Sequence, residues 1–215
     1  MRTIVVGAGS AGSVIAARLS EDARHDVVLV EAGPDYPHAA EESDHLPGDL
    51  RDGNQNSLHA HDWGYVYHAT DHRFWSALPM GFPRGRVVGG SSAVNTCIAL
   101  RGMPYDYDEW AARGLPEWSW ERCLPAFKRL ETDLDFENEW HGRDGPLPIR
   151  RHPKGELVPW QAAFLDACEE LGLPRCADTN DPTTTGAGPH AMNKIRGERV
   201  SAARAWLTSR VRARD

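Results

Sequence analysis

Residues 3–12, TIVVGAGSAG, place an apolar run directly before a G-x-G-x-x-G motif. The apolar run predicts a buried parallel strand, and residues 11–20 carry apolar side chains at helical spacing. A second apolar run at residues 27–31, VVLVE, ends in an acid. Strand, glycine turn, helix and strand in this order predict a βαβ unit, and therefore an α/β fold of the Rossmann type.

Each glycine of the motif has its own task. Gly7 permits the tight turn after the strand, Gly9 lets a pyrophosphate approach the main chain, and Gly12 lets helix and strand pack closely. The helix N-terminus offers unpaired N–H groups and a partial positive charge to the phosphates. The motif therefore predicts a site for the pyrophosphate of a dinucleotide, formed by Gly7, Gly9, Ser10, Ala11 and Gly12.

Glu31 extends this prediction to the ribose. It follows Gly12 by nineteen residues and ends the second predicted strand. There its carboxylate can accept hydrogen bonds from both hydroxyls of an adenosine ribose. The same negative charge disfavours a 2′-phosphate, which argues against NADP. FAD and NAD share the adenosine diphosphate half, so these residues alone do not separate the two cofactors.

A second glycine-rich segment lies at residues 83–95, PRGRVVGGSSAVN. Gly89 and Gly90 can adopt backbone angles that are closed to other residues. Consecutive N–H groups there can face an anion or the polar edge of a flavin. Ser91 and Ser92 are good caps for a helix, which we expect from about 91 to 99.

This second segment resembles the first signature of the glucose–methanol–choline (GMC) oxidoreductases. Further matching stretches are VEAG (30–33), DWGY (62–65), RG (101–102), DYDEW (106–110) and RVSAARAWL (199–207). The resemblance covers nearly the whole chain and is strongest to choline-oxidase-like and choline-dehydrogenase-like members. It implies FAD as the cofactor, because an NAD-dependent dehydrogenase would leave residues 83–110 without a purpose.

The resemblance also implies which residues line the flavin. They are Arg86, Val88, Gly89, Gly90, Ser91, Asn95, Thr96, Cys97 and Ile98. We expect Cys97 to be a small buried apolar residue rather than a redox group. Some members attach FAD covalently to a histidine just before the signature asparagine. Val94 stands at that position here and offers no nucleophile, so non-covalent FAD is expected.

Family members oxidise alcohols, and the resemblance implies the same reaction class. A base takes the hydroxyl proton while a hydride passes to flavin N5. That base is a histidine, paired with a second histidine or an asparagine, in a C-terminal part that lies beyond the length of this chain. We therefore name no catalytic residue and interpret the chain as an N-terminal fragment, a truncated product or one chain of a split enzyme. Without a base it should be nearly inactive alone.

The predicted organisation has three parts. They are an FAD-binding domain at 1–145, the start of an α+β substrate-binding domain at 146–198, and a helix returning toward the FAD domain at 199–215. Strands are predicted at 62–67 and at 146–150, the latter at a sheet edge because of its prolines. Further helices are predicted at 106–113, 119–131, 158–172 and 200–213. The acidic run 131–144 is interpreted as a solvated loop.

No metal site is expected. The four cysteines have neither a C-x-x-C pair nor zinc spacing. His59 and His61 are interpreted as exposed loop residues rather than metal ligands. The other histidines considered show no neighbouring acid or nucleophile in a recognisable arrangement; they are His68, His72, His141, His152 and His190.

The formal net charge of −7 gives no case for a nucleic-acid or membrane partner. Unpaired cysteines and the lack of a signal peptide predict a cytoplasmic location. Expected partners are an alcohol substrate and a complementary C-terminal chain, or a second copy bound through exposed edges. Choline-like, aliphatic, aromatic and sugar alcohols remain open, as does the electron acceptor. A non-catalytic FAD-binding subunit and an NAD-dependent dehydrogenase remain as alternatives.

Overall fold

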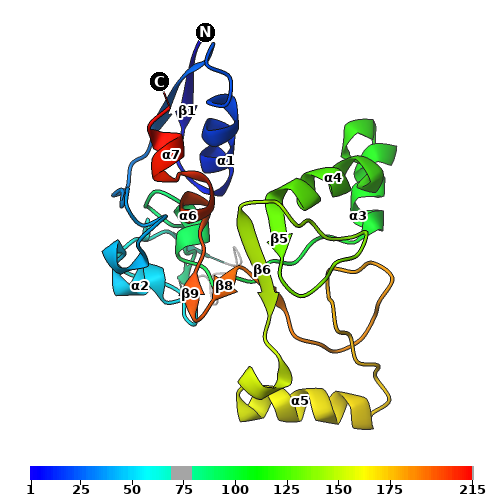
Figure 1. Ribbon diagram of the computed structural model, residues 1–215. Helices are drawn as coiled ribbons and strands as arrows, with labels where there is room; N and C mark the ends of the chain where they lie inside the picture. The colour runs from blue at the N-terminus through cyan, green and yellow to red at the C-terminus, as the bar shows by residue number, and fades with distance from the viewer. Residues whose placement is uncertain (69–78, 215) are drawn as a thin grey trace. The chain divides into compact units, whose positions relative to one another are not determined.

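The computed structural model describes residues 1–68 and 79–214, and the chain divides into two compact units. The first unit comprises residues 1–97 and 196–215, and the second comprises residues 98–195 (Figure 1). Both contain helices and strands, which confirms the mixed α/β class. The predicted domain boundaries do not coincide with these limits and stay a prediction. His72 lies outside the described residues.

The first unit opens with the predicted βαβ arrangement. β1 (Arg2–Val6) and β2 (Asp26–Val30) pair in parallel, and α1 (Ser10–Leu19) connects them and packs on both. The N–H of Gly7 donates to the carbonyl of Val30 at 2.7 Å, which ties the glycine turn to the end of β2. The turn therefore lies at the carboxyl ends of both strands, where open α/β sheets bind their ligands.

The end of the chain returns to this unit as two short helices. α6 (Ala202–Trp206) and α7 (Ser209–Arg212) replace the single predicted helix. The break occurs at Thr208, whose hydroxyl accepts a hydrogen bond from a main-chain N–H three residues later and so starts a new helix. α6 packs against α1, with the guanidinium of Arg18 4.7 Å from the centre of the Trp206 ring (Figure 1).

Shorter elements fill the rest of the first unit. They are η1 (Ser43–His45), α2 (Gly48–Arg51), β3 (Val66–Tyr67), β4 (Met80–Gly81), η2 (Gly90–Ala93) and β9 (Glu198–Arg199). β3 and β4 pair antiparallel, so the strand predicted at 62–67 is confirmed for its last two residues. The helix predicted to reach residue 99 is wrong beyond η2. Cys97 has a φ of 65°, a left-handed conformation that no α-helix continues through.

The second unit contains a three-stranded sheet in the order β5-β6-β7. These strands are β5 (Glu131–Asp133), β6 (Leu147–Arg151) and β7 (Ala191–Met192). The short β8 (Lys194–Ile195) also belongs to this unit but lies outside the three-stranded sheet. Its helices are α3 (Pro104–Ala112), η3 (Pro116–Trp118), α4 (Trp120–Leu130), η4 (Lys154–Glu156) and α5 (Pro159–Glu170). The helices predicted for this part of the chain are thus confirmed, with ends that differ by one or two residues.

β6 lies in the middle of its sheet and not at the predicted edge. It pairs in parallel with β5, where Pro148 stands opposite Thr132. It pairs antiparallel with β7 only further along, at Arg150 and Arg151. Pro148 therefore lies outside the stretch that faces β7, and its missing N–H removes no ladder bond on that side.

The start of the acidic run is buried, which corrects the predicted solvated loop. Glu131 and Asp133 belong to β5 and are 5% and 2% exposed. The hydrogen-bond partners that make this burial tolerable come from distant parts of the second unit, as described below.

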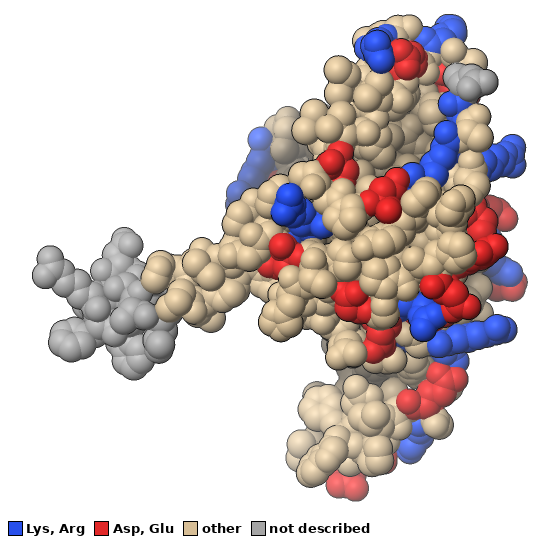
Figure 2. Space-filling model, turned by 90° about the vertical axis from the view of Figure 1, so that its left-hand side faces the viewer, with Lys and Arg blue, Asp and Glu red and all other residues tan. Residues whose placement is uncertain are grey.

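Charged side chains of both signs are mixed on the surface. Figure 2 shows Lys and Arg side chains interspersed with Asp and Glu over the face that it draws. Several of them form exposed ion pairs, such as Arg18 with Glu21 and Arg24 with Asp22. Among the described residues, no helix has the length and apolar character needed to cross a bilayer.

Candidate dinucleotide-binding site

The first glycine motif has the geometry that its spacing predicts. Gly7 has a φ of 92°, which favours glycine. A Cβ on Gly12 would lie 1.8 Å from the carbonyl oxygen of Gly7, so no larger residue fits between helix and strand. Ser10 and Ala11 are exposed at the start of α1, where first-turn N–H groups have no intrahelical acceptor. This main chain is therefore open to an anion.

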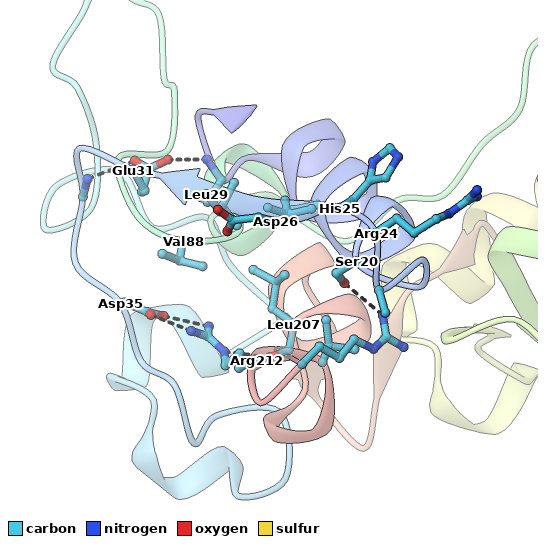
Figure 3. Close-up of a pocket in the computed structure, with 17 residues that line it drawn as sticks. Ser20, Arg24, His25, Asp26, Leu29, Glu31, Asp35, Val88, Leu207 and Arg212 are labelled. Carbon is cyan, nitrogen blue, oxygen red and sulfur yellow. Dashed lines mark hydrogen bonds and ion pairs between the residues drawn. The ribbon is translucent and has the colours of Figure 1, made fainter. Parts of the chain in front are cut away.

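Glu31 bridges the two sides of this turn. Its carboxylate accepts hydrogen bonds from the N–H of Ala8 at 2.8 Å and from the N–H of Gly33 at 2.9 Å (Figure 3). Each carboxylate oxygen can accept a second hydrogen bond. The side chain therefore stabilises the turn and still has acceptor capacity for a ribose.

The second glycine segment lies directly against the first. The N–H of Gly89 donates to the carbonyl of Ala8 at 2.7 Å. A Cβ on Gly90 would lie 2.6 Å from the Cα of Gly9, so the two glycine main chains touch. Gly89 and Gly90 have φ values of 102° and 53°, as their predicted freedom requires. Two stretches of glycine main chain that lie far apart in the sequence are thus in direct contact.

Small residues and hydroxyl groups hold the second segment in shape. Ser91 Oγ accepts from the N–H of Gly85 at 3.2 Å, and Ser92 Oγ donates to the carbonyl of Gly89 at 2.6 Å. Val88 is half-buried and its N–H donates to the carbonyl of Pro34. Beneath the segment lies a core of buried apolar side chains, namely Leu50, Val87, Ala93 and Val94.

The residues after η2 form a turn rather than a helix. Asn95 Oδ1 accepts from the N–H of Cys97 at 3.0 Å, and Cys97 is fully buried, as expected for a small apolar residue. Asn95 and Thr96 are exposed, and Arg86 extends over the ring of Trp63. Ile98 is exposed and is the first residue of the second unit.

A pocket of about 710 Å³ opens beside Glu31. Its lining comes from β2, α1 and α7, and it includes Leu29, Val88 and Leu207 (Figure 3). This volume is within the range of small-molecule sites. Arg212 borders the same pocket and is held by two hydrogen bonds to Asp35 at 2.7 and 2.9 Å. An acid beside apolar side chains offers hydrogen bonds to a ribose and contact area to a base.

The geometry of the site defines a class of protein, and comparison with known proteins then identifies the family. The parallel βαβ unit, the glycine turn and the terminal acid define a dinucleotide-binding α/β protein. The family model described as GMC oxidoreductase matches residues 1–214, and the chain belongs to this family. The resemblance inferred from the sequence is thereby confirmed.

Relatives and solved structures agree with this assignment. The chain is 39% identical to the oxygen-dependent choline dehydrogenase of Staphylococcus xylosus, over 95% of this chain and 36% of that protein. It is 37% identical to the pyridoxine 4-oxidase of Microbacterium luteolum, over 98% of this chain and 40% of that protein. The crystal structure of pyridoxine 4-oxidase from Mesorbium loti aligns with a TM-score of 0.86 and 35% identity, over 99% of this chain and 40% of that chain. The chain thus spans about two fifths of these relatives.

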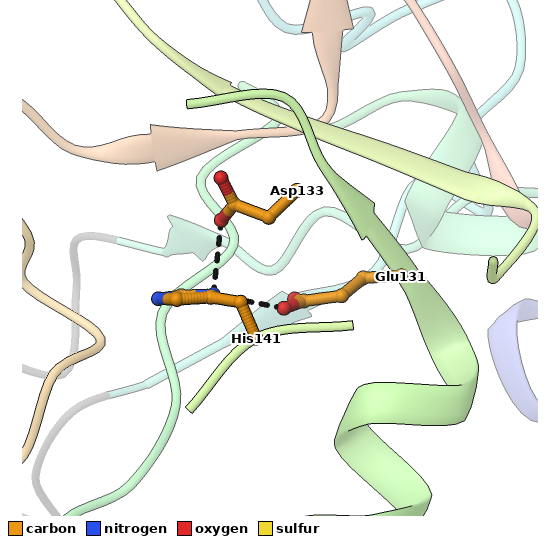
Figure 4. Close-up of side chains that lie close together, drawn as sticks. All are labelled: Glu131, Asp133 and His141. Carbon is orange, nitrogen blue, oxygen red and sulfur yellow. Dashed lines mark hydrogen bonds and ion pairs between the residues drawn. The ribbon is translucent and has the colours of Figure 1, made fainter. Parts of the chain in front are cut away.

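A second group of polar residues lies in the second unit and has metal-ligand chemistry. Glu131, Asp133 and His141 are buried, with one ligand atom of each close to the others (Figure 4). His141 Nδ1 lies 2.9 Å from Glu131 and 3.0 Å from Asp133, and Nε2 lies 2.6 Å from Asp178. Both ring nitrogens face carboxylates, so both must donate, and the ring is an imidazolium.

Arginines complete the charge balance of this group. Arg151 donates to Asp133 at 2.6 Å and to Asp178 at 2.7 Å, and Arg101 donates to Glu131 at 2.6 Å. Three carboxylates therefore meet three cations, and no carboxylate is left to bind a metal ion. We call this set the charge cluster; it consists of Arg101, Glu131, Asp133, His141, Arg151 and Asp178.

Burial and hydrogen bonding act oppositely on the charge cluster. Burial lowers the pKa of His141, but the hydrogen bonds to Asp133, Asp178 and Glu131 outweigh it and raise that pKa from 6.5 to about 10. Burial raises the pKa of Asp133, but hydrogen bonds from His141 and Arg151 hold it well below its usual value. His141 and Asp133 are therefore both charged at neutral pH.

Three histidines lie in surroundings that differ from the prediction. His141 and His152 are predicted to lack an acidic neighbour, but His141 faces three carboxylates and His152 Nδ1 lies 3.1 Å from Glu156. His61 is predicted to be exposed. His61 is buried; its Nδ1 lies 2.8 Å from Asp49 Oδ2 and its Nε2 lies 2.9 Å from the hydroxyl of Tyr36. His59 is exposed, as expected. A spacing of twelve residues between Asp49 and His61 is no local signal, so the sequence alone gave no means of finding this pair.

Replacing Glu31 by glutamine tests the ribose prediction. The amide has a single acceptor oxygen and no charge, so one main-chain N–H loses its partner. We expect the affinity for ADP to fall by about tenfold, since hydrogen bonds to charged groups contribute roughly 1.5–3 kcal/mol. We also expect less discrimination against 2′-phosphorylated ADP, and calorimetric titration measures both. Asp35→Asn is the matched control at the exposed side of the same pocket, and equal ADP affinities for all three proteins would contradict the assignment.

Proposed function

We propose that this chain forms the FAD-binding part of an oxidoreductase that acts on the CH–OH group of alcohols. The observation that carries the proposal is the direct contact between the two glycine segments at Gly9 and Gly90. A single ligand that lies along this surface meets both segments at once. An NAD-dependent dehydrogenase explains the first segment and not the second.

The residues present suit FAD. The first glycine turn and the N-terminus of α1 offer N–H groups to the pyrophosphate, and Glu31 offers acceptors to the ribose. In the second segment, the N–H groups of Gly89 and Gly90 donate to the carbonyls of Ala8 and Val87, contrary to the expectation that they face the ligand. The segment would therefore offer the flavin contact area rather than these two donors. When bound, FAD supplies an acceptor for the hydride that leaves the alcohol carbon. The chain's own contribution is to bind and orient FAD through main chain and small residues, which leave room for the cofactor.

We propose that FAD is bound non-covalently. Val94, at the position where a histidine attaches FAD in some members, is a buried apolar residue that packs in the core beneath the second segment. It offers no nucleophile to the flavin.

We further propose a complementary C-terminal chain as the partner, because apolar surface is uncovered in each unit. On β1, Ile4 and Val6 point to the same side and are 62% and 84% exposed. Parallel sheets are normally covered on both faces. Trp160 and Phe164 of α5, and Leu171 at its C-cap, are also exposed and recur at helical spacing. Relatives contain the additional chain that such surfaces require; self-association of this chain is the alternative.

One titration tests these proposals together. We expect the purified chain to acquire a flavin absorption spectrum on addition of FAD, and acid precipitation to release all of that flavin into the supernatant. We expect oxidation of an alcohol only after a C-terminal half from a relative is added. Tight NAD binding without any flavin spectrum would contradict the first proposal, and flavin retained in the precipitate would contradict the second. Dimers of this chain that persist with the C-terminal half present would favour self-association.

The proposed location is the cytoplasm. Cys123, Cys168 and Cys176 are thiols that form no disulfide with the described residues, and the last two are buried. Free thiols suit a reducing compartment.

A further inference from the structure

Arg199 is a fully buried cation whose guanidinium donates to main-chain carbonyls of the first unit. Its side chain is 0% exposed. Nε donates to the carbonyl of Asn95 at 2.9 Å, and Nη2 donates to that of Gln55 at 2.6 Å. Nη1 donates to the carbonyls of Asp49 at 3.0 Å and Leu50 at 2.6 Å. A guanidinium out of water is costly, and charge-assisted bonds of this kind are what offset that cost.

The segment that carries Arg199 also supports the other end of the second glycine segment. The N–H of Ala202 donates to Ser92 Oγ at 2.9 Å, and Ser92 Oγ in turn donates to the carbonyl of Gly89 at 2.6 Å. A Cβ on Gly89 would lie 3.2 Å from the Cβ of Ala203. Residues 199–203 therefore contact the segment 89–97 at both of its ends.

The backbone directly after the support at Asn95 is strained. Cys97 has a positive φ of 65° although it is not glycine, and the Asn95 side chain holds its N–H. Such conformations persist where surrounding bonds fix them, and they cluster at functional sites. Arg199 holds the carbonyl of Asn95, the same residue whose side chain holds Cys97.

We propose that Arg199 is a positioning residue of the flavin site, which fixes the main chain of residues 89–97 in the conformation that contacts the flavin. This inference rests on the proposed binding of FAD. It assigns Arg199 no contact with the cofactor; the residue acts through Asn95 and through the loop of residues 49–55. The carbonyls that Arg199 binds lie outside the first glycine turn.

Comparison of FAD with ADP separates positioning from general stability, because ADP reaches the first turn and FAD reaches both segments. In the full 215-residue chain, we expect Arg199→Lys to bind ADP within about twofold of the unaltered chain. We expect its FAD affinity to fall by about tenfold or more, equivalent to roughly 1.4 kcal/mol. The visible circular dichroism of the bound flavin should also change. Arg210→Lys, at an exposed position of α7, is the matched control and should alter neither.

Each result bears on the inference. Equal losses of FAD and ADP affinity, or no loss of either, would overturn it. If Arg199→Lys does not fold, Ser92→Ala takes its place, because it removes the acceptor of the Ala202 N–H. An unchanged ratio of FAD to ADP affinity in Ser92→Ala would then overturn the inference. An unaltered chain that binds ADP but no FAD would remove the proposed function itself, which is a different outcome.

Discussion

Replacement of Gly90 by alanine is expected to abolish useful FAD binding by this chain, with a loss of affinity of about a hundredfold or roughly 3 kcal/mol. The new methyl group would stand 2.6 Å from the Cα of Gly9, where only main chain can give way. Alanine also pays about 1–2 kcal/mol for the left-handed φ of 53°. The two segments must therefore separate, and a ligand that needs both loses its surface. Fluorescence titration with FAD measures the loss.

Gly48→Ala is the matched control for this substitution. Gly48 lies in α2 of the same unit, and a Cβ added there meets no atom within 4 Å. Alanine favours a helix over glycine by about 1 kcal/mol, so this variant should be as stable as the unaltered chain or more so, with full FAD affinity. If Gly90→Ala bound FAD as tightly as Gly48→Ala, the contact between the glycine segments would not be the cofactor surface.

The first glycine turn and its flanking elements could be predicted from the sequence, because neighbouring residues determine them. Strand, glycine turn, helix and acid lie within residues 3–31, and each is recognised by its immediate neighbours. The positions of β1, α1 and β2 follow within one residue at each end. The helix expected after Ser92 failed because a side-chain bond from Asn95 and the left-handed Cys97 compete with helical hydrogen bonds.

What the sequence did not reveal depends on contacts between distant residues. The touching of Gly9 and Gly90 arises from tertiary folding, as does the burial of Arg199. His141 meets Asp178 across 37 residues of chain, and the charged residues 131–133 have the composition of a loop. The carboxylates of the charge cluster can be buried because His141 and two arginines neutralise them together. No local sequence pattern predicts this pairing.

Replacement of His141 by leucine is expected to destabilise the second unit by about 3–5 kcal/mol, the usual cost of breaking a buried ion pair from one side. Three carboxylates would then share two arginines, and one buried negative charge would remain without a partner. Urea unfolding followed by tryptophan fluorescence measures the loss. His152→Leu is the matched control, because its pair with Glu156 is partly exposed and should contribute much less to stability than the buried charge cluster.

The same experiment distinguishes a charge cluster from a metal site. If Glu131, Asp133 and His141 held a metal ion, a chelator would destabilise the unaltered chain and a divalent cation would stabilise it. The arginines at this cluster already occupy the carboxylates, so we expect neither effect. A chelator-dependent loss of stability would contradict the interpretation, and so would a similar stability of His141→Leu and His152→Leu.

The histidine and the aspartates of the charge cluster contribute to the free energy of unfolding over different pH ranges. Because the pKa of His141 is about 10 when folded and 6.5 otherwise, its contribution is complete below about pH 6.5 and is lost as the pH rises toward 10. The lowered pKa values of Asp133 and Asp178 act at the other end, so their contribution is complete above about pH 4 and is lost as the pH falls further. We therefore expect the contribution of the charge cluster to the stability of the unaltered chain to be largest between about pH 4 and 6.5. His141→Leu should lose the decline on the alkaline side, because the group that releases its proton there is gone.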